Sequence, residues 1–134
     1  MALAVDYGPT LAIETLQTIF YLKEYGLKGF HDGASALAAF KPGVYDIAFI
    51  DIKTNDMGDF ELLKILKELD PNLEVVIITA YATEKSHARA IELGALEYLR
   101  KPFLMEEIYE LVDRAIEKRK QGKNNNGNQG AINA

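Results

Sequence analysis

Four polar residues stand at or just after the ends of separate apolar runs in this chain: Asp6, Asp51, Thr79 and Lys101. A nucleophilic carboxylate, a second carboxylate for a hard cation, a hydroxyl group and an ammonium group are together what phosphoryl transfer onto an aspartate requires, because that chemistry depends mostly on positioning and charge neutralisation. Each residue alone has a simpler explanation, as a helix cap, a loop residue, a strand residue or a solvated charge. The set is therefore more informative than any one member.

Asp51 lies in the stretch that organises the rest, VYDIAFIDIKTNDMGD at residues 44–59. The run IAFI is typical of a strand that is covered on both faces, and the residues after it are typical of a turn. Asp51 is therefore expected at the carboxyl end of a buried strand. Ligands bind at that edge of open parallel sheets.

Five apolar strand patterns alternate with five helical patterns along the chain. The strands are expected at residues 2–5, 27–31, 46–51, 74–79 and 97–100, and the helices at 10–25, 33–40, 60–69, 83–93 and 105–120. Such alternation predicts an α/β fold, a three-layer sandwich with helices on both faces of a five-stranded parallel sheet. All four polar residues then fall at one edge of the sheet.

Length and composition limit the remaining possibilities. The 134 residues are 49% hydrophobic and suit one domain, and they include no cysteine, which excludes disulfides and thiolate metal sites. The net charge of −5 argues against a nucleic-acid surface, and no apolar run is long enough for a membrane span. We expect a cytoplasmic protein with a folded domain at 1–120. The Asn- and Gly-rich residues 121–134 are expected to form a disordered tail or linker.

The runs AVDYGP, DIAFIDIKTNDMGDFELL, VVIITAY and GALEYLRKPF resemble the successive signatures of the response-regulator receiver domain, the CheY-like family of two-component signalling. The resemblance covers about residues 2–118. It implies a flavodoxin-like sheet of order 2-1-3-4-5 and a cis peptide bond between Lys101 and Pro102. It also implies a phosphoacceptor domain rather than an enzyme.

The resemblance assigns a role to each candidate residue. Asp51 becomes the phosphoacceptor, Lys101 the cation that contacts the phosphoryl group, and Thr79 the switch hydroxyl that also contacts it. Tyr98 becomes the aromatic that turns inward when that hydroxyl moves, although an aromatic in a short strand is more often a core residue. His31 and His87 are expected at the surface without a metal or catalytic role.

The metal site departs from the family pattern. Magnesium ligands are expected from Asp6, Asp51 and the backbone carbonyl of Lys53, but Tyr7 replaces the second of two adjacent acids. Mg²⁺ binding is therefore expected to be weak or absent. The following loop also departs, since Asn55 replaces the usual proline.

Two functions remain open, with a third for comparison. In the first, a sensor histidine kinase phosphorylates Asp51, and an output protein or domain binds a surface from about Glu84 to about Lys120, with a homodimer possible. In the second, the chain is a pseudo-receiver that acts by protein contact without phosphorylation. The third, a flavin binder of similar architecture, would need a phosphate-cradling loop after the first strand, and VDYGPT is short with a single glycine. The chain is either a single-domain regulator or a receiver from a longer protein.

Overall fold

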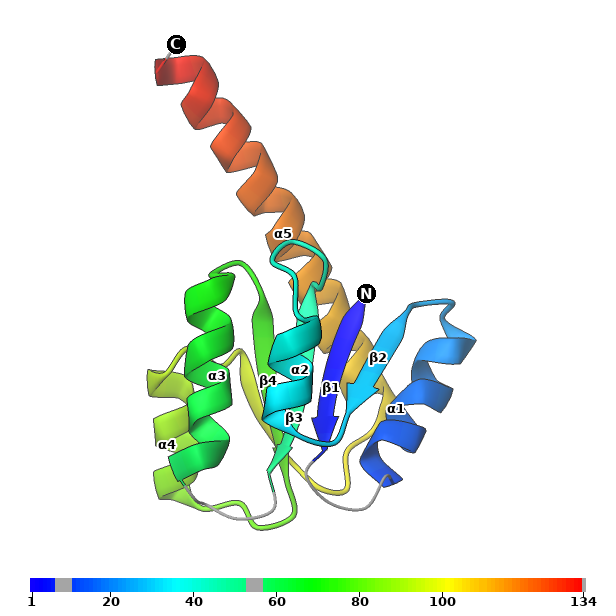
Figure 1. Cartoon of the computed structure of the whole chain (residues 1–134). Coiled ribbons are helices and arrows are strands. Elements are labelled where there is room, and N and C mark those ends of the chain that lie inside the picture. The colour runs from blue at the N-terminus through cyan, green and yellow to red at the C-terminus, as the bar shows by residue number, and fades with distance from the viewer. Residues whose placement is uncertain (7–10, 53–56, 134) are drawn as a thin grey trace.

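The computed structural model describes residues 1–6, 11–52 and 57–133, with side chains for residues 1–6, 13–52 and 60–121. Its centre is a five-stranded sheet of order β2-β1-β3-β4-β5 (Figure 1). All neighbouring strands pair in parallel. The strands are β1 (Ala2–Asp6), β2 (Leu27–Phe30), β3 (Ile47–Ile52), β4 (Glu74–Thr79) and β5 (Glu97–Arg100). The expected fold and strand order are confirmed.

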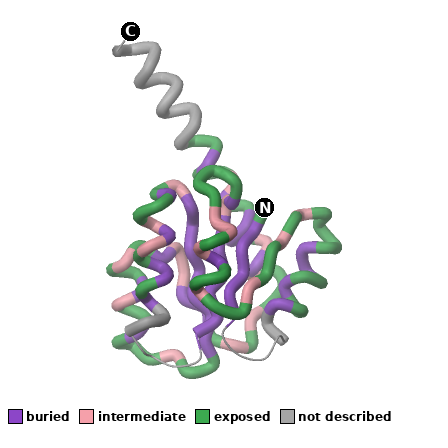
Figure 2. Tube along the Cα trace, viewed as in Figure 1, coloured by how far each residue is buried: buried purple, intermediate pink, exposed green. Residues whose placement is uncertain are grey.

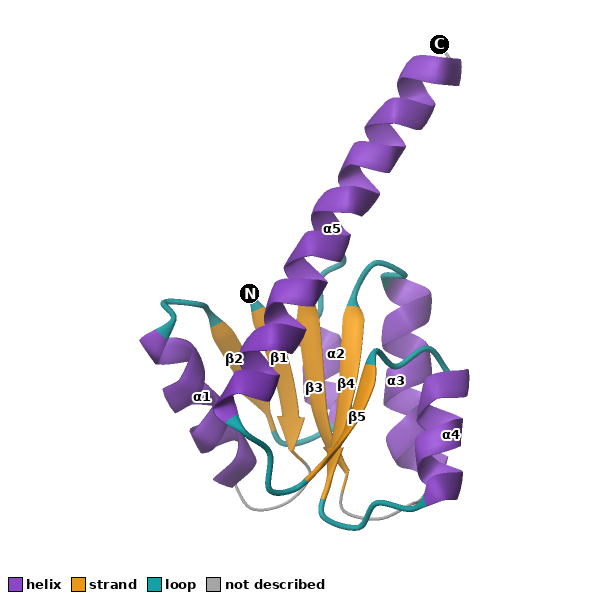
Figure 3. Cartoon of the chain, turned by 180° about the vertical axis from the view of Figure 1, so that it is seen from behind, coloured by secondary structure: helices purple, strands orange, loops and turns teal. Residues whose placement is uncertain are grey.

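Five helices cover the two faces of the sheet. They are α1 (Leu11–Leu22), α2 (Gly33–Ala39), α3 (Met57–Leu69), α4 (Glu84–Glu92) and α5 (Met105–Asn133). Side chains of α2, α3 and α4 share one core cluster with the sheet, and side chains of α1 and α5 share the other. Figure 3 shows α1 and α5 on the face that is hidden in Figure 1. The protein is therefore a three-layer sandwich.

The alternation of side chains along each strand divides the core. Leu3 and Val5 of β1 pack in the cluster of α2, α3 and α4, whereas Ala2 and Ala4 pack in the cluster of α1 and α5. Strands β1, β3 and β4 are buried along their full length (Figure 2). This explains their nearly continuous apolar sequences, since helices cover both faces.

The last helix differs from its expected extent. Its end was expected near residue 120, but α5 continues as one helix to Asn133 and projects beyond the sheet (Figure 1). The sequence contains no proline after Pro102, so no residue in this stretch lacks the backbone N–H that a helix needs. Asn and Gly are nevertheless poor helix formers, and the division into a domain at 1–120 and a disordered tail at 121–134 stays a prediction.

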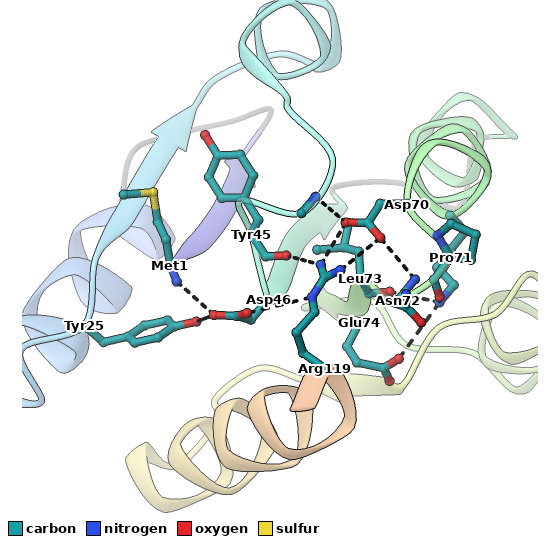
Figure 4. A network of polar contacts seen from close by, with 12 residues as sticks. Met1, Tyr25, Tyr45, Asp46, Asp70, Pro71, Asn72, Leu73, Glu74 and Arg119 are labelled. Atoms are coloured by element: carbon teal, nitrogen blue, oxygen red, sulfur yellow. Dashed lines mark hydrogen bonds and ion pairs between the residues drawn. The ribbon is translucent and has the colours of Figure 1, made fainter. Parts of the chain in front are cut away.

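Ion pairs fasten α5 to the edge of the sheet where the strands begin (Figure 4). Arg119 of α5 is 8% exposed and donates hydrogen bonds to the carboxylate of Asp70 and to the carbonyl oxygen of Tyr45. Asp46 lies 3.9 Å from Nε of Arg119 and also accepts a hydrogen bond of 2.5 Å from the Tyr25 hydroxyl. Lys118 pairs with Glu74 at the start of β4. The carboxylates of Asp70 and Glu74 and the carbonyl oxygen of Tyr45 thus hold the turn of α5 that carries Lys118 and Arg119.

Candidate functional site

Two carboxylates lie side by side where β1 and β3 end. Asp6 of β1 is the register partner of Asp51 of β3. The two residues are only 1% and 3% exposed. Burial of a carboxylate is costly unless charge or hydrogen bonds compensate it. The parallel pairing of two central strands therefore places a concentrated negative charge at the carboxyl edge of the sheet.

Lys101 supplies a positive charge to this pair. Its Nζ lies 2.5 Å from Oδ2 of Asp51, with 28% of the lysine side chain exposed. The residue follows β5, and its backbone N–H donates to the carbonyl oxygen of Thr79 at 2.8 Å. The peptide bond from Lys101 to Pro102 is cis, as expected. The first residue beyond the edge strand thus reaches the carboxylate at the centre of the sheet.

Thr79 ends β4 one register step from Asp51, because its partner on β3 is Ile52. The residue is 1% exposed, and its Oγ1 accepts a hydrogen bond of 3.0 Å from the backbone N–H of Tyr81. Strand alternation places Thr79 on the same face as Val75 and Ile77, which is the face of α3 and α4. Asp51 alternates with Ile50 and Ile52, so it belongs to the opposite face.

Tyr98 is buried on the α4 face of β5, at 8% exposure. Its hydroxyl is in hydrogen-bond contact with Oγ of Ser86. Its ring also stacks on His87, with ring centroids 5.1 Å apart and an angle of 7° between the planes. His87 is exposed, as expected. No sequence pattern connects Ser86 or His87 with Tyr98, because a serine in the first turn of a helix is usually explained as a cap.

A hard cation would find only part of its ligand set among these residues. The buried carboxylates of Asp6 and Asp51 offer the oxygen atoms that Mg²⁺ prefers, and Mg²⁺ retains several water ligands in most protein sites. Within the described residues, no group of three or more His, Cys, Asp or Glu side chains could hold a metal ion. Tyr7, Lys53 and Asn55 lie outside the described residues. The two carboxylates therefore supply oxygen atoms of the kind that a hydrated Mg²⁺ ion can bind.

A shallow hollow of about 350 Å³ lies beside Tyr98 on the surface formed by α4 and β5. Its lining consists of Ala82, Thr83, Glu84, His87, Tyr98 and Arg100. It lies in the region expected to contact an output protein.

No helix in the described part of the chain is both long and apolar enough to cross a bilayer.

The comparisons with known proteins agree on one family. The sequence model of the response regulator receiver domain matches residues 3–113. The DNA-binding transcriptional regulator NtrC of Proteus hauseri is 37% identical over 89 residues, which are 66% of this chain and 19% of that protein. The transcriptional regulatory protein ZraR of Salmonella typhimurium is 30% identical over 86 residues, 64% of this chain and 20% of that protein. The chain thus matches about a fifth of the length of these relatives.

Solved structures agree with the sequence comparison. A CheY-like response regulator receiver domain protein from Methanospirillum hungatei has a TM-score of 0.78 and 25% identity, covering 90% of this chain and 96% of that chain. NtrX from Brucella abortus has a TM-score of 0.83 and 25% identity, covering 99% of this chain and 30% of that chain. The similarity extends over the whole sheet and its helices.

Proposed function

Because the chain belongs to the response regulator receiver domains of two-component signalling, we propose that Asp51 accepts a phosphoryl group from a sensor histidine kinase and thereby switches a protein-interaction surface. The observation that carries this proposal is the ion pair between Lys101 and Asp51, formed beside the carboxylate of Asp6 at the carboxyl edge of the sheet. An ammonium group in this position neutralises the nucleophile and, after transfer, the phosphoryl oxygens.

The transfer step follows from these positions. A carboxylate oxygen of Asp51 attacks phosphorus, the P–N bond to the kinase histidine breaks, and the imidazole leaves with the electron pair of that bond. Mg²⁺, when bound by Asp6 and Asp51, would supply further charge neutralisation. Lys101 remains within reach of the phosphoryl oxygens. Thr79 ends the neighbouring strand, and its hydroxyl would leave the N–H of Tyr81 to bind one of them.

The switch would then act through α4, β5 and α5. A phosphoryl group on Asp51 adds a charge of about −1.5 to −2, a magnitude taken from phosphorylated hydroxyl residues. Thr79 and Tyr98 share the sheet face that α4 covers, so a change at Thr79 is transmitted toward the surface from about Glu84 to about Lys120. An output protein or domain would bind there, and a homodimer could form there. We place this activity in the cytoplasm and assign the domain no separate enzymatic reaction.

Phosphate incorporation tests the proposal directly. The chain is incubated with Mg²⁺ and acetyl phosphate, and its mass is measured intact. We expect one phosphoryl group in the wild type, none in Asp51→Asn, and a strong reduction in Lys101→Ala. Asp113→Asn removes an exposed carboxylate of α5 and serves as the matched control. Failure of the wild type to incorporate phosphate from acetyl phosphate or from a kinase would leave a pseudo-receiver that acts by contact alone.

The metal ligands can be tested separately. In Asp6→Asn, we expect most of the phosphorylation to be lost. The phosphorylation that remains should not depend on the Mg²⁺ concentration. Tyr7→Asp introduces the second acid of the family pattern, and we expect it to lower the Mg²⁺ concentration required for half-maximal phosphorylation by about tenfold or more, because a direct carboxylate is added to the ligand set. An unchanged Mg²⁺ requirement in Tyr7→Asp would remove Tyr7 as the explanation for weak metal binding.

A further inference from the structure

Ser86 connects the first turn of α4 to the aromatic residue of β5. It occupies the third position of the helix and is 4% exposed. Its Oγ is in hydrogen-bond contact with the hydroxyl of Tyr98, which is also buried. Both groups are removed from water, so each depends on the other or on protein neighbours for its hydrogen bonds.

Several partners share the hydroxyl of Ser86. Oγ of Ser86 accepts from the Thr83 hydroxyl at 2.9 Å and lies 3.2 Å from the Thr83 carbonyl oxygen, to which it can donate. A serine hydroxyl has one hydrogen and two lone pairs. The backbone N–H of Thr83 lies 3.4 Å from the same Oγ, as the capping box of α4 requires, so Oγ faces more donors than it has lone pairs, and either hydroxyl of the Ser86–Tyr98 contact can be the donor. The tyrosine hydroxyl is thereby in contact with a side chain of the capping box of α4.

His87 restrains the same ring from a second direction. Its imidazole stacks almost parallel to the ring of Tyr98, with 5.1 Å between the centroids. Two consecutive residues of α4 therefore hold one side chain of β5, Ser86 at the hydroxyl and His87 at the face. In contrast, the hydroxyl of Thr79 is bonded to the backbone N–H of Tyr81.

We propose that Ser86 is a positioning residue that holds Tyr98 turned inward before any phosphorylation, so that the switch aromatic is tied to the N-terminal cap of α4. The inference rests on the proposed role of Tyr98 in switching. It differs from the expectation that this ring turns inward only when the Thr79 hydroxyl moves. In this protein, a phosphoryl group would act on a ring that is already buried, and loosening of the Ser86 contact would alter the first turn of α4.

The orientation of Tyr98 tests this inference in the unphosphorylated chain. Tyrosine rings are labelled with ¹³C, the Tyr98 signal is assigned with Tyr98→Phe, and its relaxation enhancement by a soluble paramagnetic agent is measured. Tyr21, at 83% exposure, and Tyr45, at 2%, are internal references for an exposed and a buried ring. We expect the wild-type Tyr98 signal to resemble that of Tyr45. In Ser86→Ala the relaxation enhancement of Tyr98 should rise severalfold, toward the value of Tyr21. Ser86→Thr should restore the wild-type value.

Ser35 provides a matched control. It occupies the third position of α2, where its N–H and Oγ bond to the N-cap Asp32, but it contacts no aromatic ring among the described residues and is exposed. Ser35→Ala removes the equivalent capping hydroxyl and should leave the Tyr98 signal unchanged. An unchanged Tyr98 signal in Ser86→Ala would overturn the proposal, as would an equal response to Ser35→Ala.

A double-mutant cycle gives an independent measurement. Tyr98→Phe should lower the ratio of folded to unfolded protein by about fivefold, the effect of one net hydrogen bond, and Ser86→Ala should lower it further because it also removes the bonds to Thr83. The double variant should be little worse than Ser86→Ala alone, because that substitution has already removed the contact with Tyr98. Ser35→Ala combined with Tyr98→Phe should be additive. Additive effects of Ser86→Ala and Tyr98→Phe would overturn the proposal.

Beryllofluoride, which mimics an aspartyl phosphate, separates this inference from the proposed function. Its binding is followed by the fluorine signal of the bound group, which does not depend on Tyr98. If beryllofluoride does not bind but Ser86→Ala exposes Tyr98, the inference holds and phosphorylation at Asp51 fails. If beryllofluoride binds but Tyr98 behaves alike in the wild type and Ser86→Ala, phosphorylation is supported and the inference is overturned.

Discussion

The guanidinium group of Arg119 forms a two-pronged ion pair with the carboxylate of Asp70, with N–O distances of 2.8 and 3.2 Å. It also donates to the carbonyl oxygen of Tyr45 at 2.6 Å. Asp70 in turn accepts the N–H of Gly43 at 2.9 Å. One side chain of α5 is therefore bonded to the segment before β3 and to the segment before β4, at the edge of the sheet opposite to Asp51.

Arg119→Ala should lower the free energy of unfolding by about 3 kcal/mol, because it leaves the buried carboxylate of Asp70 without its charged partner. Arg119→Lys should recover only part of this loss, since a lysine cannot reproduce the planar pair of N–H donors. Chemical denaturation monitored by circular dichroism gives both values. Lys120→Ala changes the exposed neighbouring residue and should stay within about 0.5 kcal/mol of the wild type. A similar loss in both alanine variants would contradict a specific role for Arg119.

Stability should fall in acid through the same pair. Burial raises the pKa of the Asp70 carboxyl, but hydrogen bonds from Arg119 and from the N–H of Gly43 outweigh it and hold the pKa below its ordinary value. A carboxyl whose folded pKa is depressed stabilises the fold above its unfolded pKa of about 3.9, and this contribution is lost as pH falls through the folded pKa. The decline should therefore begin below about pH 4.

Urea unfolding between pH 2.5 and 7 measures this dependence. Asp70→Asn should be less stable at neutral pH and should show a shallower decline in acid, because one carboxyl with a depressed pKa has been removed. Asp46 should contribute in the same range, since its hydrogen bond with Tyr25 opposes the effect of burial and leaves its pKa lowered as well. An acid slope in Asp70→Asn as steep as that of the wild type would contradict the assignment to Asp70.

The domain boundary at residue 120 can be tested by shortening the chain. Residues 1–120 retain Arg119 and its ion pair, so this chain should unfold within about 0.5 kcal/mol of the full chain. Residues 1–118 lack Arg119 and should lose about 3 kcal/mol, as Arg119→Ala does. Denaturation of the two shortened chains and the full chain supplies the comparison. Equal destabilisation of both shortened chains would place the boundary beyond residue 120.

The fold could be predicted because each central strand has a local signature. IAFI before Asp51 and EVVIIT ending at Thr79 are continuous apolar segments, and Asp6, Asp51 and Lys101 all follow such segments. Parallel strands bring these ends to one edge, so the sequence positions alone indicated a common site. The ion pair between Lys101 and Asp51 agrees with that expectation.

The contacts of Ser86 and Arg119 could not be predicted in the same way. Ser86 satisfies a local rule as a capping residue, and its second contact depends on the distance between α4 and β5. Arg119 stands among charged residues in EKRKQ, which is typical of a solvated helix face. Its burial arises because the segments before β3 and β4 meet over the turn of α5 that carries Arg119. Ser86 and Tyr98 are 12 residues apart and Arg119 is 49 residues from Asp70, so neither contact follows from a local sequence pattern.

Gly29 shows how one missing side chain permits the packing of α1 on the sheet. A Cβ built at Gly29 would lie 2.7 Å from Cγ2 of Ile13, which is too close for two carbon atoms. Gly29→Ala should therefore lower the free energy of unfolding by about 1–3 kcal/mol, the usual cost of overpacking. At Gly26 the nearest atom is the flexible end of Met1 at 3.3 Å, so Gly26→Ala serves as the tolerated control.

The same contact predicts a compensating change. Ile13→Ala alone should cost about 2–4 kcal/mol, because it empties a buried site between α1 and β2. In that background Cγ2 is absent, and adding Gly29→Ala should cost nothing further or should stabilise the chain by up to about 1 kcal/mol, since alanine loses less backbone entropy than glycine in a strand. Thermal and urea unfolding of the four chains measure the interaction. A cost of Gly29→Ala that is the same with and without the Ile13 side chain would show that the clash lies elsewhere.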